Sequence, residues 1–248
     1  MSKTLYLECY SGISGDMTVA ALLDLGADRE VLKESLKSLP VGGFRTEITR
    51  VKKSGLDACD FSVILEQDNH DHDMEYLHGS EKSYTGHHEH HHGHTYSHEH
   101  PHEHRGMKEI TEIIQKSEMT VRAKKMAMRV FGILAQAESK AHGVPVEEVH
   151  FHEVGAVDSI VDIAAIAICM DNLDISNVIV PVLYEGTGFI RCQHGQIPVP
   201  VPAVTHIAET HKLKLKITDI QGELVTPTGA AVVAAFRTSD RLPEDFTM

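Results

Sequence analysis

The stretch TLYLECYSGISGDMTVAALLDLGA, residues 4–27, changes its hydrophobic pattern twice within a few residues. Its first seven residues are largely apolar or aromatic and predict a short buried strand. The small residues of GISGDM predict a tight turn, and the apolar residues after it predict a helix that ends at Gly26. A strand that turns directly into a helix is typical of proteins that mix the two kinds of element.

The rest of the chain repeats this alternation. Helical patterns cover residues 28–39, 107–117, 120–142, 159–173, 204–211 and 226–236, and strand patterns cover residues 44–53, 57–67, 177–184 and 213–218. Ser54 and Gly55 separate two alternating segments and predict a hairpin. We therefore expect an α/β or α+β fold, with a mixed sheet, packed helices and one disordered insertion.

Composition narrows the classes of function. The chain has 248 residues, 23 of them basic and 36 acidic, for a net charge of −13, which disfavours binding to nucleic acid or to an acidic membrane. Four cysteines without a C-x-x-C pair favour free thiols in a reducing cytosol. No signal-peptide core and no apolar run of about 20 residues is evident, so we expect a cytoplasmic protein. A homo-oligomer is a further expectation for its assembly.

Residues 68–104 form the predicted insertion. They contain no Val, Ile or Phe, so they cannot bury enough apolar surface to offset the entropy of ordering. We expect this segment to be disordered and to separate two parts of one α/β core, residues 1–67 and 105–248.

The end of the insertion, HHEHHHGHTYSHEHPHEH, is dense in imidazole. Weak binding of several Ni, Zn or Cu ions follows from that density. Catalysis needs fixed geometry, so we interpret the run as a metal reservoir, with a tolerated low-complexity insertion as the alternative. The reservoir residues are His87, His88, His90, His91, His92, His94, His98, His100, His102 and His104.

A second group of ligand-type residues follows in VHFHEVGAVDSIVDI, residues 149–163. In an extended segment His150 and His152 would share a face, and Glu153 follows directly. Asp158 and Asp162 lie four residues apart, on one face of the predicted helix. This set suits a divalent ion such as Ni, Mn or Zn. The alternative is a solvated strand end followed by an Asp158 helix cap, although a carboxylate inside an apolar helix needs a partner.

Two glycine-containing turns and one histidine leave their roles open. Each turn precedes a helix whose amides could bind an anion. Alternatively, each is an ordinary capped turn, with Ser14 as the cap and Asp16 favouring the helix dipole in the first, and Thr226 or Thr228 as the cap in the second. The residues concerned are Ser14, Gly15 and Asp16 in the first turn and Thr226, Thr228 and Gly229 in the second. His194 precedes a glycine and a proline-rich segment, and it is either structural or free to reach a site.

Four motifs, taken in order, resemble the LarC family of nickel insertion proteins. They are ECYSGISGDM, HFHEVGAVDSIVDI, HGQIPVPVPA and ELVTPTGAA, and the resemblance runs from Leu5 to about Phe236. It implies a nickel chelatase, or cyclometallase, that inserts Ni²⁺ into pyridinium-3,5-bisthiocarboxylic acid mononucleotide. The product would be the nickel-pincer nucleotide of lactate racemase and related enzymes, and the family reaction uses CTP with Mn²⁺ or Mg²⁺. A variable His-rich stretch is also a habit of the family.

The resemblance identifies the motifs and not the task of each residue, so we infer the roles from the chemistry of nickel insertion. The ion would be held by His150, His152, Glu153, Asp158 and Asp162, and phosphate by the helix starts at Gly15 and Gly229. His194 and Glu153 are candidate bases for the pyridinium C4 proton. Full-length members continue into a C-terminal domain associated with CTP, which this chain is expected to lack and could receive as a separate partner.

Two other functions fit the same residues. A nickel storage protein or metallochaperone would act through the His-rich run alone. A metal-dependent nucleotide hydrolase would use the carboxylates with Mn²⁺.

Overall fold

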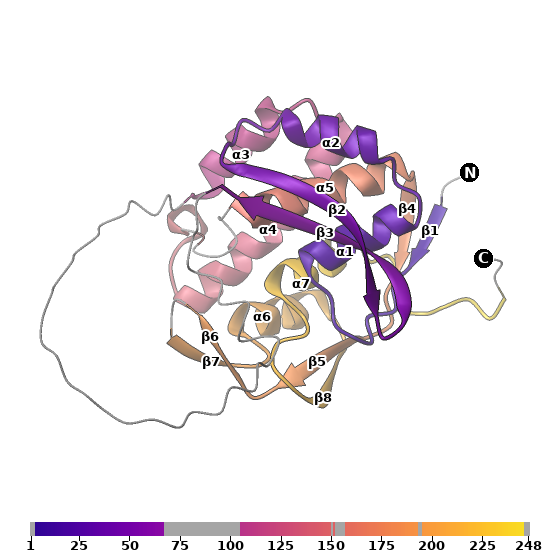
Figure 1. Cartoon of the computed structure of the whole chain (residues 1–248). Coiled ribbons are helices and arrows are strands. Elements are labelled where there is room, and N and C mark those ends of the chain that lie inside the picture. The colour runs from indigo at the N-terminus through magenta and orange to yellow at the C-terminus, as the bar shows by residue number, and fades with distance from the viewer. Residues whose placement is uncertain (1–2, 67–104, 150, 152–156, 193–194, 246–248) are drawn as a thin grey trace, which may run out of the picture.

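The computed structural model describes residues 3–66, 105–149, 151, 157–192 and 195–245. Helices and short strand pairs alternate along it, which confirms the mixed α/β class (Figure 1). Residues 68–104 lie outside the described residues, so their predicted disorder and the proposed division of the chain stay predictions.

Helix α5 forms the centre of the core. It spans Val157–Asn172, and all its residues from Ile163 to Met170 are buried. Helices α1 (Gly15–Asp24), α2 (Arg29–Lys37), α4 (Val121–His142) and α7 (Pro227–Phe236) all pack against it (Figure 1). The apolar composition of α5 follows from this position, because a helix covered on every side needs no polar face.

The outer helices follow the predicted patterns. Helix α4 begins after Thr120, whose hydroxyl accepts from the Ala123 amide at 3.0 Å, and it ends at Gly143 in the left-handed conformation. Helix α3 (Met107–Lys116) buries three isoleucines against α4, and α6 (Pro202–His211) packs on α4 and α7. A short 3₁₀ helix covers Val146–Glu148.

The strands form pairs, so the expected single mixed sheet is wrong for the described residues. These residues contain four two-stranded sheets. Strands β1 (Lys3–Tyr6) and β4 (Ile175–Ile179) are parallel, as are β5 (Leu183–Thr187) and β8 (Leu215–Gln221). The antiparallel pairs are β2 (Phe44–Lys53) with β3 (Leu56–Leu65) and β6 (Phe189–Cys192) with β7 (Gly195–Pro198).

Three details of the strand predictions need correction. The predicted strand 177–184 divides into β4 and β5, because Pro181 lies in it and has no amide to donate to a ladder. The first strand is only four residues long and buries Leu5 alone. The hairpin of β6 and β7 was not predicted. The turn at Ser54 and Gly55 is confirmed, with φ of 51° and 83°.

Among the described residues, no helix has both the length and the apolar character needed to cross a membrane.

Candidate functional site

The turns before α1 and α7 are joined by backbone hydrogen bonds. The Ile13 amide donates to the Leu224 carbonyl at 2.9 Å, and the Thr226 amide donates to the Ile13 carbonyl at 3.1 Å. Ile13 and Val225 thereby form a parallel bridge. Two motifs from opposite ends of the sequence therefore start their helices at the same place in the fold.

Both helix starts are capped by their own side chains. The Ser14 hydroxyl accepts from the Met17 amide at 3.4 Å, and the Thr226 hydroxyl accepts from the Gly229 amide at 3.1 Å. Pro227 occupies the first turn of α7, as its sequence position predicts. The capping interpretation of Ser14 and Thr226 is confirmed, while phosphate binding at either start stays a prediction.

Close packing explains the two glycines. A Cβ atom on Gly15 would lie 2.4 Å from Asp162 Oδ2 and 2.9 Å from Asp162 Cβ. A Cβ atom on Gly229 would lie 2.2 Å from the Ile13 carbonyl oxygen. Gly15 thus lets α1 approach the Asp162 side chain on α5, and Gly229 lets α7 approach the Ile13 turn.

The approach of α1 to α5 creates an acidic cluster. Burial raises the pKa of Asp162 well above its usual range, and the charges of Asp16 and Asp158 raise it further, while the Asp16 backbone amide donates to it and acts in the opposite direction. Part of Asp162 reaches solvent, but its Oδ1 atom is buried and accepts no hydrogen bond within the described structure. The sequence analysis expected a partner for this carboxylate. Within the described structure, the Asp16 amide donates to one of its oxygen atoms and the other has no hydrogen bond.

Asp158 is not the cap of α5, which corrects the alternative interpretation of that residue. Helix α5 includes Val157, so Asp158 lies inside its first turn. Its charge acts on Asp162, one helical turn further along, as the spacing of four residues predicts.

Glu185 on β5 was missed by the sequence analysis. The residue is fully buried, and its Oε1 atom accepts from the amides of Gly186 at 2.7 Å, Leu224 at 2.8 Å and Val225 at 3.2 Å. Its Oε2 atom is buried without a hydrogen-bond partner in the described structure. The signal in the sequence was a lone acid between apolar and glycine residues in VLYEGTG. Glu185 holds the segment that leads into α7.

Several of the predicted site residues fall in the segments that the structure leaves undescribed. His150, His152, Glu153 and His194 lie outside the described residues, as does the whole His-rich run. Near them, Phe151 is buried, and its amide donates to the Arg105 carbonyl at 3.3 Å in an isolated antiparallel bridge. Arg105 directly follows His104 in the sequence. The described residues alone contain no group of three or more His, Cys, Asp or Glu side chains placed to hold a metal.

The carboxylates of α5 and the two joined helix starts define an α/β protein with an acidic cluster beside the start of α1. Comparison with known proteins makes this class specific. The family described as nickel insertion protein matches residues 5–247, and the chain belongs to this family.

The relatives are much longer than the chain. A pyridinium-3,5-bisthiocarboxylic acid mononucleotide nickel insertion protein of Alkaliphilus metalliredigens is 55% identical over 247 residues, which are 99% of this chain and 55% of the relative. Proteins of the same description from Acetivibrio thermocellus and Geobacillus kaustophilus are 36% and 42% identical over 231 residues each, 93% of this chain and 51% and 50% of theirs. The chain thus spans about half the length of these relatives. No solved structure matches it.

Proposed function

We propose that the chain provides the nickel-binding part of an insertion reaction on pyridinium-3,5-bisthiocarboxylic acid mononucleotide. The observation that supports this most is the Asp162 carboxylate. It is held against Gly15, faces two further acids and leaves one buried oxygen atom without a hydrogen bond. A buried carboxylate in such surroundings is costly unless a cation binds beside it. The names of the relatives indicate that this cation is nickel and that the substrate is the pyridinium mononucleotide.

In this proposal Ni²⁺ is a substrate held by side chains from one motif. Asp158 and Asp162 provide oxygen ligands from α5, and His150, His152 and Glu153 provide the remainder. Mixed imidazole and carboxylate ligands suit a divalent first-row metal, and they release it more readily than thiolates would. Asp16 lies close enough to act on Asp162, so it belongs to this acidic group.

The mononucleotide phosphate fits the start of α7 better than the start of α1. Helix α1 carries Asp16 in its first turn and faces two more acids, whereas the first turn of α7 has no acidic residue. An anion at a helix start is stabilised by the amides there and destabilised by neighbouring carboxylates. We therefore assign the phosphate to the first turn of α7 before that of α1. The Thr226 and Gly229 amides already donate within the protein, so Thr228 is the candidate donor there.

The chemical step is a proton loss coupled to metal binding. The pyridinium C4–H bond breaks, its electron pair forms the bond to nickel, and the proton passes to Glu153 or His194. Such a base need only lie within hydrogen-bond reach of the C4 proton. CTP with Mn²⁺ or Mg²⁺ would act through the half that the longer relatives possess, either on the same polypeptide or as a separate partner.

The test is a nickel insertion assay on the purified chain, with and without the remaining half of the Alkaliphilus metalliredigens relative supplied as a second protein. Formation of the nickel-containing nucleotide is followed by mass spectrometry. Wild-type protein with the second half should form it, and Asp162→Asn should reduce the rate at least about tenfold if a ligand is lost. Asp174→Asn is the matched control, because Asp174 is exposed and its φ of 54° suits asparagine.

Other outcomes would favour the alternative functions. Turnover of nucleotide with Mn²⁺ in the absence of the pyridinium substrate would favour a hydrolase. Nickel binding that needs only residues 87–104, with equal activity in wild-type and Asp162→Asn proteins, would favour a storage protein or metallochaperone.

A further inference from the structure

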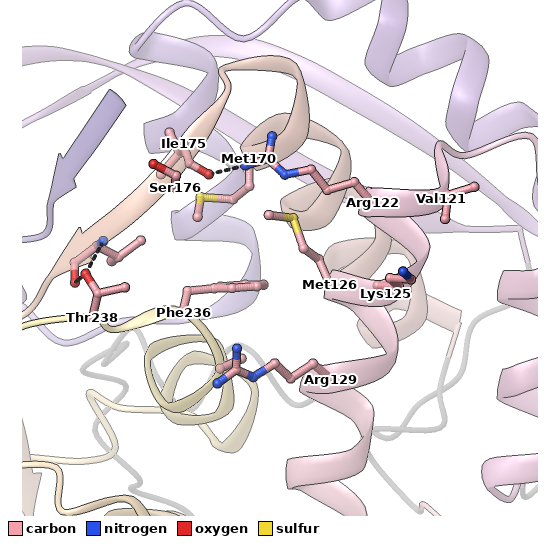
Figure 2. A pocket seen from close by; sticks show the side chains of 12 residues that line it. Val121, Arg122, Lys125, Met126, Arg129, Met170, Ile175, Ser176, Phe236 and Thr238 are labelled. Atoms are coloured by element: carbon pink, nitrogen blue, oxygen red, sulfur yellow. Dashed lines mark hydrogen bonds between the residues drawn. The ribbon is translucent and has the colours of Figure 1, made fainter. Parts of the chain in front are cut away.

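A cavity of about 610 Å³ lies at the other end of α5 and α7 from Asp162. It is bounded by the first turns of α4, by β4 and by the last turn of α7 (Figure 2). Asp162 and Met170, which lines the cavity, are eight residues apart on α5, or about 12 Å along the helix axis. The cavity is therefore separate from the acidic cluster.

One wall of the cavity is cationic. Arg122, Lys125 and Arg129 lie at spacings of three and four residues, which places them on one face of α4. The residues that line the cavity include no carboxylate, although the chain carries a net charge of −13.

The three cations differ in their partners. Arg122 bonds to Asp171 and Asp174, each at 3.2 Å, and to the Ile175 carbonyl, so its charge is compensated and its position is fixed. Lys125 and Arg129 are exposed and form no ion pair with a carboxylate in the described ranges. Two positive charges therefore remain available at the cavity.

The other wall is apolar and polarisable. Met126, Met170 and Phe236 point into the cavity, and the guanidinium group of Arg129 extends toward the α7 side (Figure 2). An aromatic ring beside thioether side chains offers a flat surface for stacking a heteroaromatic ring. A solvated helix face would explain the cations but not the apolar wall beside them.

We propose that this cavity binds a nucleoside phosphate, with the base against Phe236 and the methionines and the phosphate near Lys125 and Arg129. The two walls require a ligand that is flat and aromatic at one end and anionic at the other. Lys and Arg side chains form strong charge-assisted hydrogen bonds with phosphate, and stacking adds affinity without requiring one particular base. This inference does not depend on nickel insertion.

Isothermal titration calorimetry tests the proposal, with the full chain stripped of metal so that no metal bridges phosphate to histidine. AMP and ATP are titrated, with adenosine and inorganic phosphate as the two separate halves of the ligand. AMP should bind more tightly than either half, and ATP more tightly than AMP at low salt, because its additional charge is attracted to the same cations. Affinity should fall as salt screens these exposed charges.

Variants assign the binding to this cavity. Arg129→Gln and Lys125→Gln should each weaken ATP binding about tenfold, and Phe236→Leu should weaken AMP binding by a similar factor, as expected for charged hydrogen bonds and stacking. Lys140→Gln, which removes an exposed cation elsewhere on α4, should change neither affinity. Circular dichroism confirms that each variant is folded. The proposal is overturned if neither nucleotide binds, if phosphate alone binds as well as AMP, or if the Arg129 and Phe236 variants bind like the wild-type protein.

Discussion

Asp162 determines the charge state of the acidic cluster. Its pKa in the folded protein is raised, first by burial and then by Asp16 and Asp158. The folded state therefore binds a proton more tightly than the unfolded chain, in which an aspartate titrates near pH ~3.9. The stability that this proton provides is complete below that pH and is lost as pH rises through the folded pKa. A bound metal ion would compensate for the ionised carboxylate.

This argument predicts opposite effects of Asp162→Asn on stability and on nickel binding. Asparagine keeps the shape of the side chain and removes the charge. At neutral pH without metal, the variant should unfold about 2–4 °C higher, the shift that ~1 kcal/mol produces in a domain of this size. Scanning calorimetry at pH 4 and pH 7.5 should show the advantage only at the higher pH. Calorimetric nickel titration should show weaker binding, and a variant less stable than wild type at both pH values would contradict the argument.

Glu185 predicts a second effect of a single side chain. Its Oε1 atom accepts three backbone amides and so holds the segment before α7. Glu185→Gln replaces the carboxyl group with an amide whose NH₂ group would be buried, and it should lower the free energy of unfolding by about 1–3 kcal/mol. Urea unfolding measures this value. Glu112→Gln is the control, because Glu112 forms an exposed pair with Lys116, and its substitution should change stability by less than about 0.5 kcal/mol.

At the scale of elements, local patterns predicted most helices and failed where distant contacts decide. The long helix α4 was predicted because its apolar periodicity is local to the segment, and the structure shows that Thr120 caps its start and Gly143 ends it. The β2–β3 hairpin was predicted for the same reason. The division between β4 and β5 was missed although Pro181 marks it. The acceptance of three amides by Glu185 has no local signature, since two of the donors lie 39 and 40 residues away.

Substitutions at two helical glycines allow the effect of local helix propensity to be measured apart from the effect of distant packing. Gly132 lies inside α4, and an added Cβ would meet nothing within 4 Å, whereas a Cβ on Gly229 would lie 2.2 Å from the Ile13 carbonyl oxygen. Gly132→Ala should therefore stabilise the protein by up to about 1 kcal/mol through helix propensity. Gly229→Ala should destabilise it by about 1–3 kcal/mol, because the backbone of the Ile13 turn must move.

Urea unfolding of both alanine variants measures the difference. Equal stability of the Gly229→Ala and Gly132→Ala variants would contradict the close packing of Gly229 against the Ile13 carbonyl. The nickel-binding measurement adds a second readout, since displacement of the Ile13 turn would also move Gly15 and thus alter the environment of Asp162.

At the scale of the whole molecule, the candidate site combines segments that are far apart in the sequence. The α1 turn meets the α7 turn through Ile13 and Val225, and Gly15 meets Asp162 on α5. The order of the motifs did not predict which would touch, because long-range packing decides it. The family resemblance predicted the membership that the comparison confirms. The roles of the imidazole residues stay predictions.

The residue that follows the His-rich run in the sequence contacts the HFHE motif. Arg105, the residue after His104, bonds through its carbonyl to the Phe151 amide in the HFHE motif. The last histidines of the run directly precede Arg105 in the sequence, and Arg105 contacts the HFHE segment that we propose receives the nickel. This arrangement favours a loading role, in which the run raises the local concentration of nickel and takes no part in the chemical step.

Deletion of residues 87–104 tests that role. The variant should bind fewer Ni²⁺ ions, and the ions lost should be those that wild-type protein releases below about pH 6, where imidazoles are protonated. Insertion should slow at limiting nickel and approach the wild-type rate at saturating nickel. Deletion of residues 68–86 is the control, because it removes a segment of nearly the same length with three histidines in place of ten. Equilibrium dialysis at pH 7.5 and pH 5.5 measures the stoichiometry. Loss of insertion even at saturating nickel, with the control deletion fully active, would show that the run itself contains the reacting metal site.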